Sequence, residues 1–257
     1  MYQDANDLER AISSYHTAIS YRPTLASAYL NLGLCAWEKN DSETAKEVFE
    51  KCLKLDATHL KNPRNHRSAQ VACAYNLGES LSQIGDFDQA EYYFQKALLH
   101  APSHIPAYLT LSQLRLKQKR YTEALEVLQS AYRLNETNSL LNFHMGVYYS
   151  ARGDHPEAIK YLKRAEVVNG KNADVLSALA ESCRQTGLNE EAEKYYERLA
   201  EMGDETSPFA YSNYAAILHV NGKYEKAERM YKKAIEINPN DSLSNKNLRK
   251  LYRLMNR

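Results

Sequence analysis

A segment of 34 residues repeats along this chain, and that period constrains the fold more than any other feature of the sequence. Seven alanines share one local context, at spacings of 34, 45, 34, 34, 34 and 35 residues. A bulky residue often follows four positions later and a small one three further on, as in Ala90, Phe94 and Ala97. Such steps keep residues on one helix face. The alanines are Ala11, Ala45, Ala90, Ala124, Ala158, Ala192 and Ala227.

A second amphipathic segment precedes each alanine segment, so that every unit contains two helices. A glycine or another small residue stands at position 8 of the unit and the alanine at position 20, which lets two antiparallel helices approach closely. Proline at position 32, as at Pro102 and Pro239, ends the second helix. This pattern is typical of the tetratricopeptide repeat. We expect the helices to turn at position 15, which holds Asn40, Gly85, Lys119, Gly153, Gly187 and Gly222.

The repeats predict an all-α fold, a tetratricopeptide-repeat right-handed superhelical solenoid of about fourteen helices. Only 9 glycines in 257 residues agree with long uninterrupted helices. A polar cap is expected at the C-terminus, whereas Leu8 and Ile12 have no covering helix before them, so we expect the chain to begin inside a longer array. The single array over 1–257 would comprise a half repeat (1–25), repeats at 26–59, 71–104, 105–138, 139–172, 173–206 and 208–241, an insertion (60–70) and the capping helix (242–256).

The insertion at 60–70 interrupts the period and carries basic residues without an acidic one. We interpret it as a surface loop with an early start of the next helix. The alternative is a loop that contacts a partner.

Charge and hydropathy exclude several classes of protein. Lys and Arg total 33 and Asp and Glu 32, so the net charge of +1 argues against nucleic-acid binding. No apolar run reaches 18 residues, so the chain is expected to lack a membrane span, and its first residues do not resemble a secretory signal. A hydrophobic content of 44% is sufficient for a core.

No catalytic, cofactor or metal motif is recognisable. Asp86-Phe87-Asp88 resembles a metal-binding Asp-x-Asp, but its place at positions 16 to 18 predicts a helix cap instead. The four cysteines are expected to be buried free thiols. In an oxidising compartment a bridge from Cys52 to Cys35 or to Cys73 is compatible with the repeat geometry. Three Asn-x-Ser/Thr sequons fall in turns and could carry glycans in a lumenal protein, or could serve only as turn residues: Asn40, Asn135 and Asn240.

The inner faces of the first helices are the expected protein-binding surface of such an array. Their mixture of aromatic, aliphatic and amide side chains suits an extended peptide. No unit combines Lys at position 5 with Asn at position 9, so binding of chaperone C-terminal tails is not expected. The candidate groove residues are Leu30, Asn31, Leu34, Trp37, Tyr75, Asn76, Glu79, Leu109, Gln113, Phe143, Val147, Arg184 and Asn213.

Several stretches are more specific than the general repeat pattern. They are Ala28–Gly33, Leu60–Ser68, Gly187–Tyr196, Ala216–Gly222 and Asn247–Leu251. In this order they resemble the C-terminal repeats of the transmembrane and tetratricopeptide-repeat-containing proteins, a family of O-mannosyltransferases that act on cadherins.

The resemblance implies a membrane-anchored parent enzyme that transfers mannose from dolichyl-phosphate mannose to Ser/Thr residues of cadherin extracellular domains. The repeats would lie in the endoplasmic reticulum lumen and bind or position the acceptor. No catalytic residue of the family can be placed on this chain, so the isolated chain is not expected to transfer sugar. The alternative is a non-enzymatic cytoplasmic scaffold that assembles protein partners.

Overall fold

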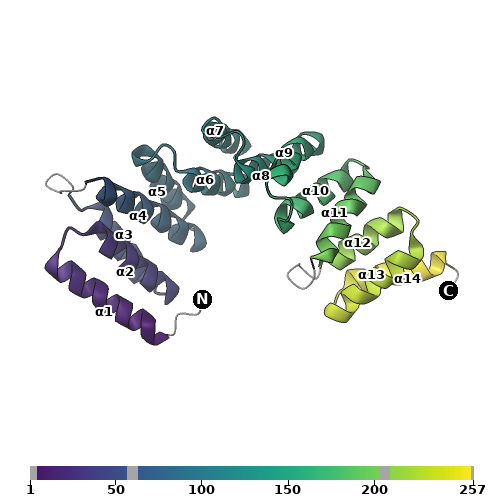
Figure 1. The fold of residues 1–257 in the computed structure, drawn as a ribbon, viewed down its shortest axis with the longest axis horizontal. Helices are drawn as coiled ribbons and strands as arrows, with labels where there is room; N and C mark the ends of the chain where they lie inside the picture. The colour runs from purple at the N-terminus through teal and green to yellow at the C-terminus, as the bar shows by residue number, and fades with distance from the viewer. Residues whose placement is uncertain (1–4, 57–62, 203–208, 256–257) are drawn as a thin grey trace. The chain divides into compact units, whose positions relative to one another are not determined.

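The structure is a computed structural model that describes residues 5–56, 63–202 and 209–255. In these ranges the chain forms fourteen α-helices and no strand, which confirms the predicted all-α class (Figure 1). The helices group into two compact units, residues 1–134 and 135–257.

The first unit contains seven helices. They are α1 (Ala5–Tyr21), α2 (Ala26–Glu38), α3 (Ser42–Leu53), α4 (Pro63–Gln83), α5 (Phe87–His100), α6 (Ile105–Lys117) and α7 (Tyr121–Tyr132). The second unit also contains seven. They are α8 (Ser139–Ala151), α9 (His155–Val168), α10 (Ala173–Gln185), α11 (Asn189–Glu201), α12 (Phe209–Val220), α13 (Tyr224–Ile237) and α14 (Ser242–Leu254).

The turns between paired helices lie where the repeat predicts them. All six position-15 residues have a left-handed backbone, with φ between 73° and 88° at the four glycines. Asn40 (φ 59°) and Lys119 (φ 61°) adopt the same conformation without being glycine. After three of the six turns the next helix begins at an aspartate cap, and at Asp86 the side chain accepts the backbone N–H of Gln89 at 3.2 Å. The interpretation of Asp86 as a helix cap is therefore confirmed.

Close helix approach explains the small residues at position 8. A Cβ atom added to Gly78 would lie 2.7 Å from Cε1 of Phe94, and one added to Gly146 would lie 2.5 Å from Cγ of Leu162. Position 20 is equally tight, because its alanine is completely buried in all six full repeats, including Ala158. The packing of each helix pair therefore depends on the absence of side-chain volume at two fixed positions.

The described part of the insertion is helical. Residues 63–70 form the first two turns of α4, so the early helix start is confirmed, while the expected loop at 60–62 lies outside the described residues. His66 is buried with its Nε2 atom 3.3 Å from the carbonyl oxygen of Leu55. Gln70 donates to the same oxygen at 2.9 Å. The extension thus packs on the end of α3 and satisfies its carbonyl groups.

The expectation of four free thiols is wrong. Cys52 of α3 and Cys73 of α4 form a disulfide, with their Cα atoms 6.5 Å apart, whereas Cys35 and Cys183 are free. Both bonded cysteines are completely buried where α4 packs along α3. Of the two partners left open for Cys52, the structure selects Cys73.

The last helix, α14, presents two different faces. Leu251 and Ser244 are completely buried against the preceding repeat. The opposite face is exposed and basic, with Lys246, Arg249 and Lys250. One face of α14 is thus buried and another is polar, as is expected of a capping helix.

Candidate protein-binding surface

The groove candidates of α2 lie at the boundary between core and solvent. Leu30, Leu34 and Trp37 are half-buried and pack against the core of the first unit. Asn31, between them in sequence, is also half-buried. The first-helix face therefore presents the edges of hydrophobic side chains together with an amide.

Tyr75 on α4 joins the surface to the core. Its ring lies 5.9 Å from that of Phe94 and 5.2 Å from that of His104, and its hydroxyl is 3.3 Å from the hydroxyl of Thr110 on α6. Burial raises the pKa of Tyr75. Tyr75 is therefore partly buried against the core, and its side chain connects two consecutive first helices.

The remaining candidates of the first unit differ widely in exposure. Asn76 is half-buried, and its amide donates to the carbonyl oxygen of Ala72 at 2.8 Å. Glu79 is half-buried and Gln113 is exposed, whereas Leu109 is only 5% exposed and belongs to the core. Of these four, Gln113 is the most accessible to a partner.

The candidates of the second unit lie on α8, α10 and α12. Phe143 is partly buried and packs against the core of the second unit, and Val147 is half-buried. Arg184 is exposed, but its guanidinium donates to Glu181 at 2.6 and 2.8 Å, which neutralises its charge locally. Asn213 is exposed. The predicted residues thus fall into two sets, one on each unit, with different local chemistry.

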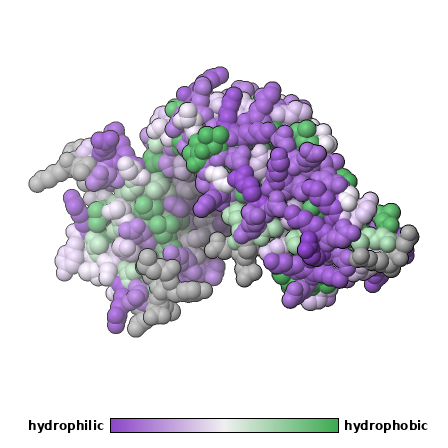
Figure 2. Space-filling view, turned by 45° about the vertical axis from the view of Figure 1, so that its right-hand side comes forward, coloured by the Kyte–Doolittle hydropathy of each residue, from purple (hydrophilic) through white to green (hydrophobic). Residues whose placement is uncertain are grey.

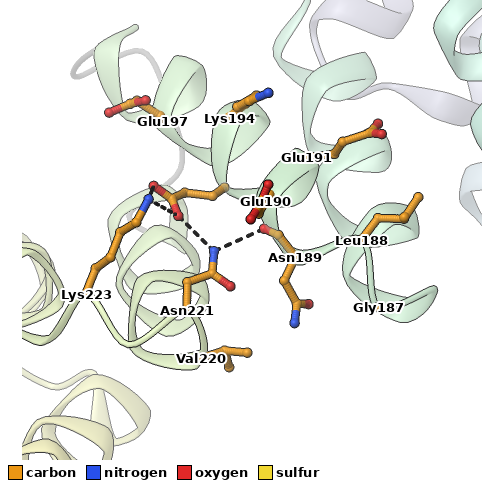
Figure 3. Close-up of a pocket in the computed structure, with 11 residues that line it drawn as sticks. Gly187, Leu188, Asn189, Glu190, Glu191, Lys194, Glu197, Val220, Asn221 and Lys223 are labelled. Carbon is orange, nitrogen blue, oxygen red and sulfur yellow. Dashed lines mark hydrogen bonds and ion pairs between the residues drawn. The ribbon is translucent and has the colours of Figure 1, made fainter.

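A hollow of about 970 Å³ lies between α11 and the turn that joins α12 to α13 (Figure 3). At its centre Glu193 accepts hydrogen bonds from Asn221 at 2.8 Å and from Lys223 at 2.7 Å. Burial alone would raise the pKa of Glu193, but these donors outweigh burial and lower it. The charge of Glu193 is satisfied within the chain, so these side chains brace two repeats.

A second buried charge network connects α5, α6 and α7. Arg115 and Arg120 each place a guanidinium nitrogen 2.6 Å from a carboxylate oxygen of Glu91. Arg120 also pairs with Glu123. Burial would raise the pKa of Glu91, but the hydrogen bonds from the two arginines lower it. Sequence inspection missed this network, because its members are 24 and 29 residues apart and only the fold brings them together.

The exposed surface is mainly polar. In the face drawn in Figure 2, hydrophilic residues predominate and hydrophobic ones lie in separate groups. The three sequon asparagines, Asn40, Asn135 and Asn240, are exposed. Across the described ranges, no three His, Cys, Asp or Glu side chains gather as metal ligands would. None of the described helices is both long and apolar enough to cross a bilayer.

These paired helices, their glycine turns and their exposed first-helix faces define a tetratricopeptide repeat protein. Models described as tetratricopeptide repeat match residues 26–59, 70–137 and 171–240, and the chain belongs to this family. Two solved structures share the fold. The APC/C Cut9–Hcn1 hetero-tetramer matches with a TM-score of 0.69 and 17% identity, over 95% of this chain and 46% of that one. Pseudomonas aeruginosa pilF matches with a TM-score of 0.70 and 18% identity, over 88% and 97%.

Among curated proteins, the chain is similar to the human protein O-mannosyl-transferase TMTC2. The two are 31% identical over 250 residues, which cover 83% of this chain and 30% of the relative. Human TMTC1 is 25% identical over 90% of this chain and 25% of its own length. Superkiller protein 3 of Schizosaccharomyces pombe is 24% identical over 90% of this chain and 17% of its own length. The chain thus spans less than a third of each of these relatives, and the resemblance to O-mannosyltransferases is confirmed.

Proposed function

We propose that this chain is the lumenal tetratricopeptide-repeat module of a protein O-mannosyltransferase, and that it binds or positions the acceptor protein. The observation that carries the proposal is the 31% identity to TMTC2 over 250 residues. In this proposal the membrane part of the enzyme transfers mannose from dolichyl-phosphate mannose. The repeats hold the cadherin extracellular domain whose Ser/Thr residues are modified.

The disulfide supports a lumenal location. Stable disulfides form in oxidising compartments such as the endoplasmic reticulum and are rare in the cytosol. The Cys52–Cys73 bond joins two helices at a buried contact, where it stabilises the first unit. The exposure of Asn40, Asn135 and Asn240 is compatible with glycan attachment in the same compartment.

The first-helix faces support a role in protein recognition. They combine half-buried aromatic edges, such as Trp37 and Phe143, with the amides of Asn31, Gln113 and Asn213. Aromatic rings supply contact area, and amides can both donate to and accept from a peptide backbone. A strand of an acceptor domain presents such a backbone.

A second candidate function is a scaffold in the cytoplasm. Superkiller protein 3 and BBSome complex member BBS4 match 90% and 88% of this chain, at 24% and 22% identity. The two candidates differ in the expected state of Cys52 and Cys73, because a cytosolic chain would keep both thiols reduced.

The decisive experiment combines location with binding. We expect the protein isolated from cells under thiol-blocking conditions to contain the Cys52–Cys73 bond, and its Asn40, Asn135 or Asn240 peptides to lose mass with an endoglycosidase. We expect purified wild-type chain to bind a cadherin extracellular domain, and Gln113→Ala with Asn31→Ala to weaken binding by about 1–2 kcal/mol in total.

Gln129 provides the matched control. It is exposed on α7, the second helix of its repeat, so Gln129→Ala removes a side-chain amide outside the first-helix face. Reduced cysteines together with unglycosylated sequons would favour the scaffold. Equal affinity of the groove variant and the Gln129→Ala control would remove the acceptor-binding role.

A further inference from the structure

The first helix of the last repeat, α12, and the capping helix, α14, carry matching stripes of exposed and half-buried residues. Each stripe follows the helical steps of four, three and four residues, and the two are offset by one 34-residue period. On α12 the stripe is Phe209, Asn213, Ala216 and Val220, and on α14 it is Leu243, Asn247, Lys250 and Leu254.

The two stripes lie on neighbouring helices. The buried hydroxyl groups of Ser212 on α12 and Ser244 on α14 are 2.8 Å apart. The two helices pack against each other and, with α13, form the C-terminal end of the second unit (Figure 1). Ser212 and Ser244 are 32 residues apart in the chain, so the two stripes run along neighbouring helices with their equivalent residues displaced by about two residues, roughly 3 Å along the helix axis.

Large apolar side chains mark both ends of the paired stripes. At one end Phe209 is 63% exposed and Leu243 is 58% exposed. At the other end Val220 is 65% exposed and Leu254 is 60% exposed. These four exposed hydrophobic residues gather at the two ends of neighbouring helices, whereas the exposed apolar residues of an ordinary surface are scattered singly.

The middle of the surface is cationic. Lys246, Lys250 and Arg253 are exposed on α14, which contains no acidic residue. None of the ion pairs among the described residues uses these three cations. A hollow of about 610 Å³ opens on this helix beside them. Burial lowers the pKa of His219 on α12, and the positive charge of Lys250 lowers it further, so the Lys250 charge reaches across to α12.

We propose that the paired faces of α12 and α14 bind a short acidic segment of a protein chain that carries an apolar residue at each end. The twelve residues from Phe209 to Val220 place the first and last Cα atoms roughly 16 Å apart along the helix. In an extended chain of five residues the first and last Cα atoms lie about 13–14 Å apart, and long apolar side chains at the two ends reach over the remaining distance. Apolar first and fifth residues would contact the two hydrophobic pairs, and the acidic residues between them would face Lys246 and Lys250.

The arrangement favours a discrete peptide over a membrane surface. A helix that lies on a bilayer carries apolar side chains along its whole length, with cations along the flank. Here the large apolar residues occupy only the ends of the stripes, and the middle holds Asn213, Ala216, Asn247 and Lys250. The proposal does not depend on the mannosyltransferase function, because it concerns binding by the chain alone.

The test is a fluorescence-anisotropy titration of the 257-residue chain with a labelled peptide acetyl-Leu-Asp-Glu-Asp-Leu-amide. Both peptide ends are blocked, so no terminal carboxylate contributes. The comparison peptide replaces the acidic residues by Asn-Gln-Asn. We expect the acidic peptide to bind at least tenfold more tightly and its affinity to fall with added salt.

The diagnostic variant is Lys250→Glu, and the matched control is Lys194→Glu, which makes the same charge change at an exposed position of α11. We expect Lys250→Glu to lower the affinity at least tenfold and Lys194→Glu to leave it unchanged, with both variants retaining wild-type circular dichroism. A second variant, Val220→Ser, tests the apolar end and should lower the affinity about threefold.

Three results would overturn the proposal. Equal binding of both peptides would exclude recognition of the acidic residues. Equal losses of peptide affinity in Lys250→Glu and Lys194→Glu would show that the peptide is attracted only by the net charge of the chain. Binding of phosphatidylserine vesicles, but not of the peptide, in a manner sensitive to Lys250→Glu would assign the surface to a membrane. None of these outcomes bears on mannosyl transfer, so failure here is distinguishable from failure of the proposed function.

Discussion

Removal of the disulfide tests the structure of the first unit and the compartment of the protein together. The bond joins Cys52 and Cys73 across 21 residues of chain. In the chain-entropy relation, closing a loop of about 20 residues destabilises the unfolded state by roughly 3 kcal/mol at 25 °C. We therefore expect reduction of the bond to lower the free energy of unfolding of the first unit by about 3 kcal/mol.

The assay is urea unfolding followed by circular dichroism, with and without a thiol reductant. The wild-type chain should unfold at a lower urea concentration when it is reduced. Cys73→Ala should match the reduced wild type in both conditions, because it cannot form the bond. Cys35→Ala should still respond to the reductant, since Cys35 is free. The transition of the second unit should not move, because the bond lies wholly within residues 1–134.

An identical unfolding curve for the oxidised and reduced wild type would refute this reasoning. A non-reducing peptide digest separates the two ways in which that could happen. If the digest contains no Cys52–Cys73 peptide, the bond does not form and the support for a lumenal location disappears. If the peptide is present, contacts such as those of His66 and Gln70 with Leu55 already restrict this loop in the unfolded chain.

Three further predictions concern stability. Glu91→Ala leaves two partly buried arginines without their shared partner and should cost about 3 kcal/mol, measured by urea unfolding against the wild type. Ala158→Leu should overpack a completely buried helix contact and cost about 1–3 kcal/mol, and an unchanged melting temperature would contradict the packing register. Burial lowers the pKa of His144 from 6.5 to about 4, so the unfolded chain binds more protons than the folded chain between these values. Stability should therefore fall from pH 6.5 to pH 4, and His144→Gln should show a shallower fall over that range.

The local geometry of the helix pairs was predictable from the repeat alone. Asn40 and Lys119 adopt a left-handed backbone because of their position in the 34-residue repeat, not because of their residue type. The backbone conformation at position 15 is set by the two antiparallel helices that the turn must join, and these helices are the same in each repeat. The burial of Ala158 follows from the same register.

Features that depend on contacts outside the 34-residue period were not predictable. The helical extension at 63–70 is stabilised by His66 and Gln70 against the end of α3, and no repeat position encodes those contacts. The partner of Cys52 stayed open in the sequence, because Cys35 and Cys73 both lie one helix away. Tertiary packing decides such choices, so the sequence pattern constrains them only weakly.

The candidate binding surface also has features that the repeat predicts and features that it does not. Leu109 and Gln113 lie on one helix and were both expected to face the groove, yet Leu109 is in the core and Gln113 is exposed. Repeat position specifies the direction of a side chain from its own helix. The exposure of that side chain depends on how closely the next helix packs, and this packing differs from repeat to repeat.

This difference separates two kinds of candidate binding residue in the chain. Tyr75 contacts Phe94, His104 and Thr110, so a change there alters folding and surface together. Lys250 has no such role in packing, because it is exposed on a helix that buries Leu251 and Ser244 instead. In a solenoid each repeat contacts only its neighbours, so substitutions at exposed stripe positions leave the rest of the array undisturbed. Partner specificity can therefore change at α12 and α14 at little cost in stability, whereas the aromatic face of the first unit must keep its residues to remain folded.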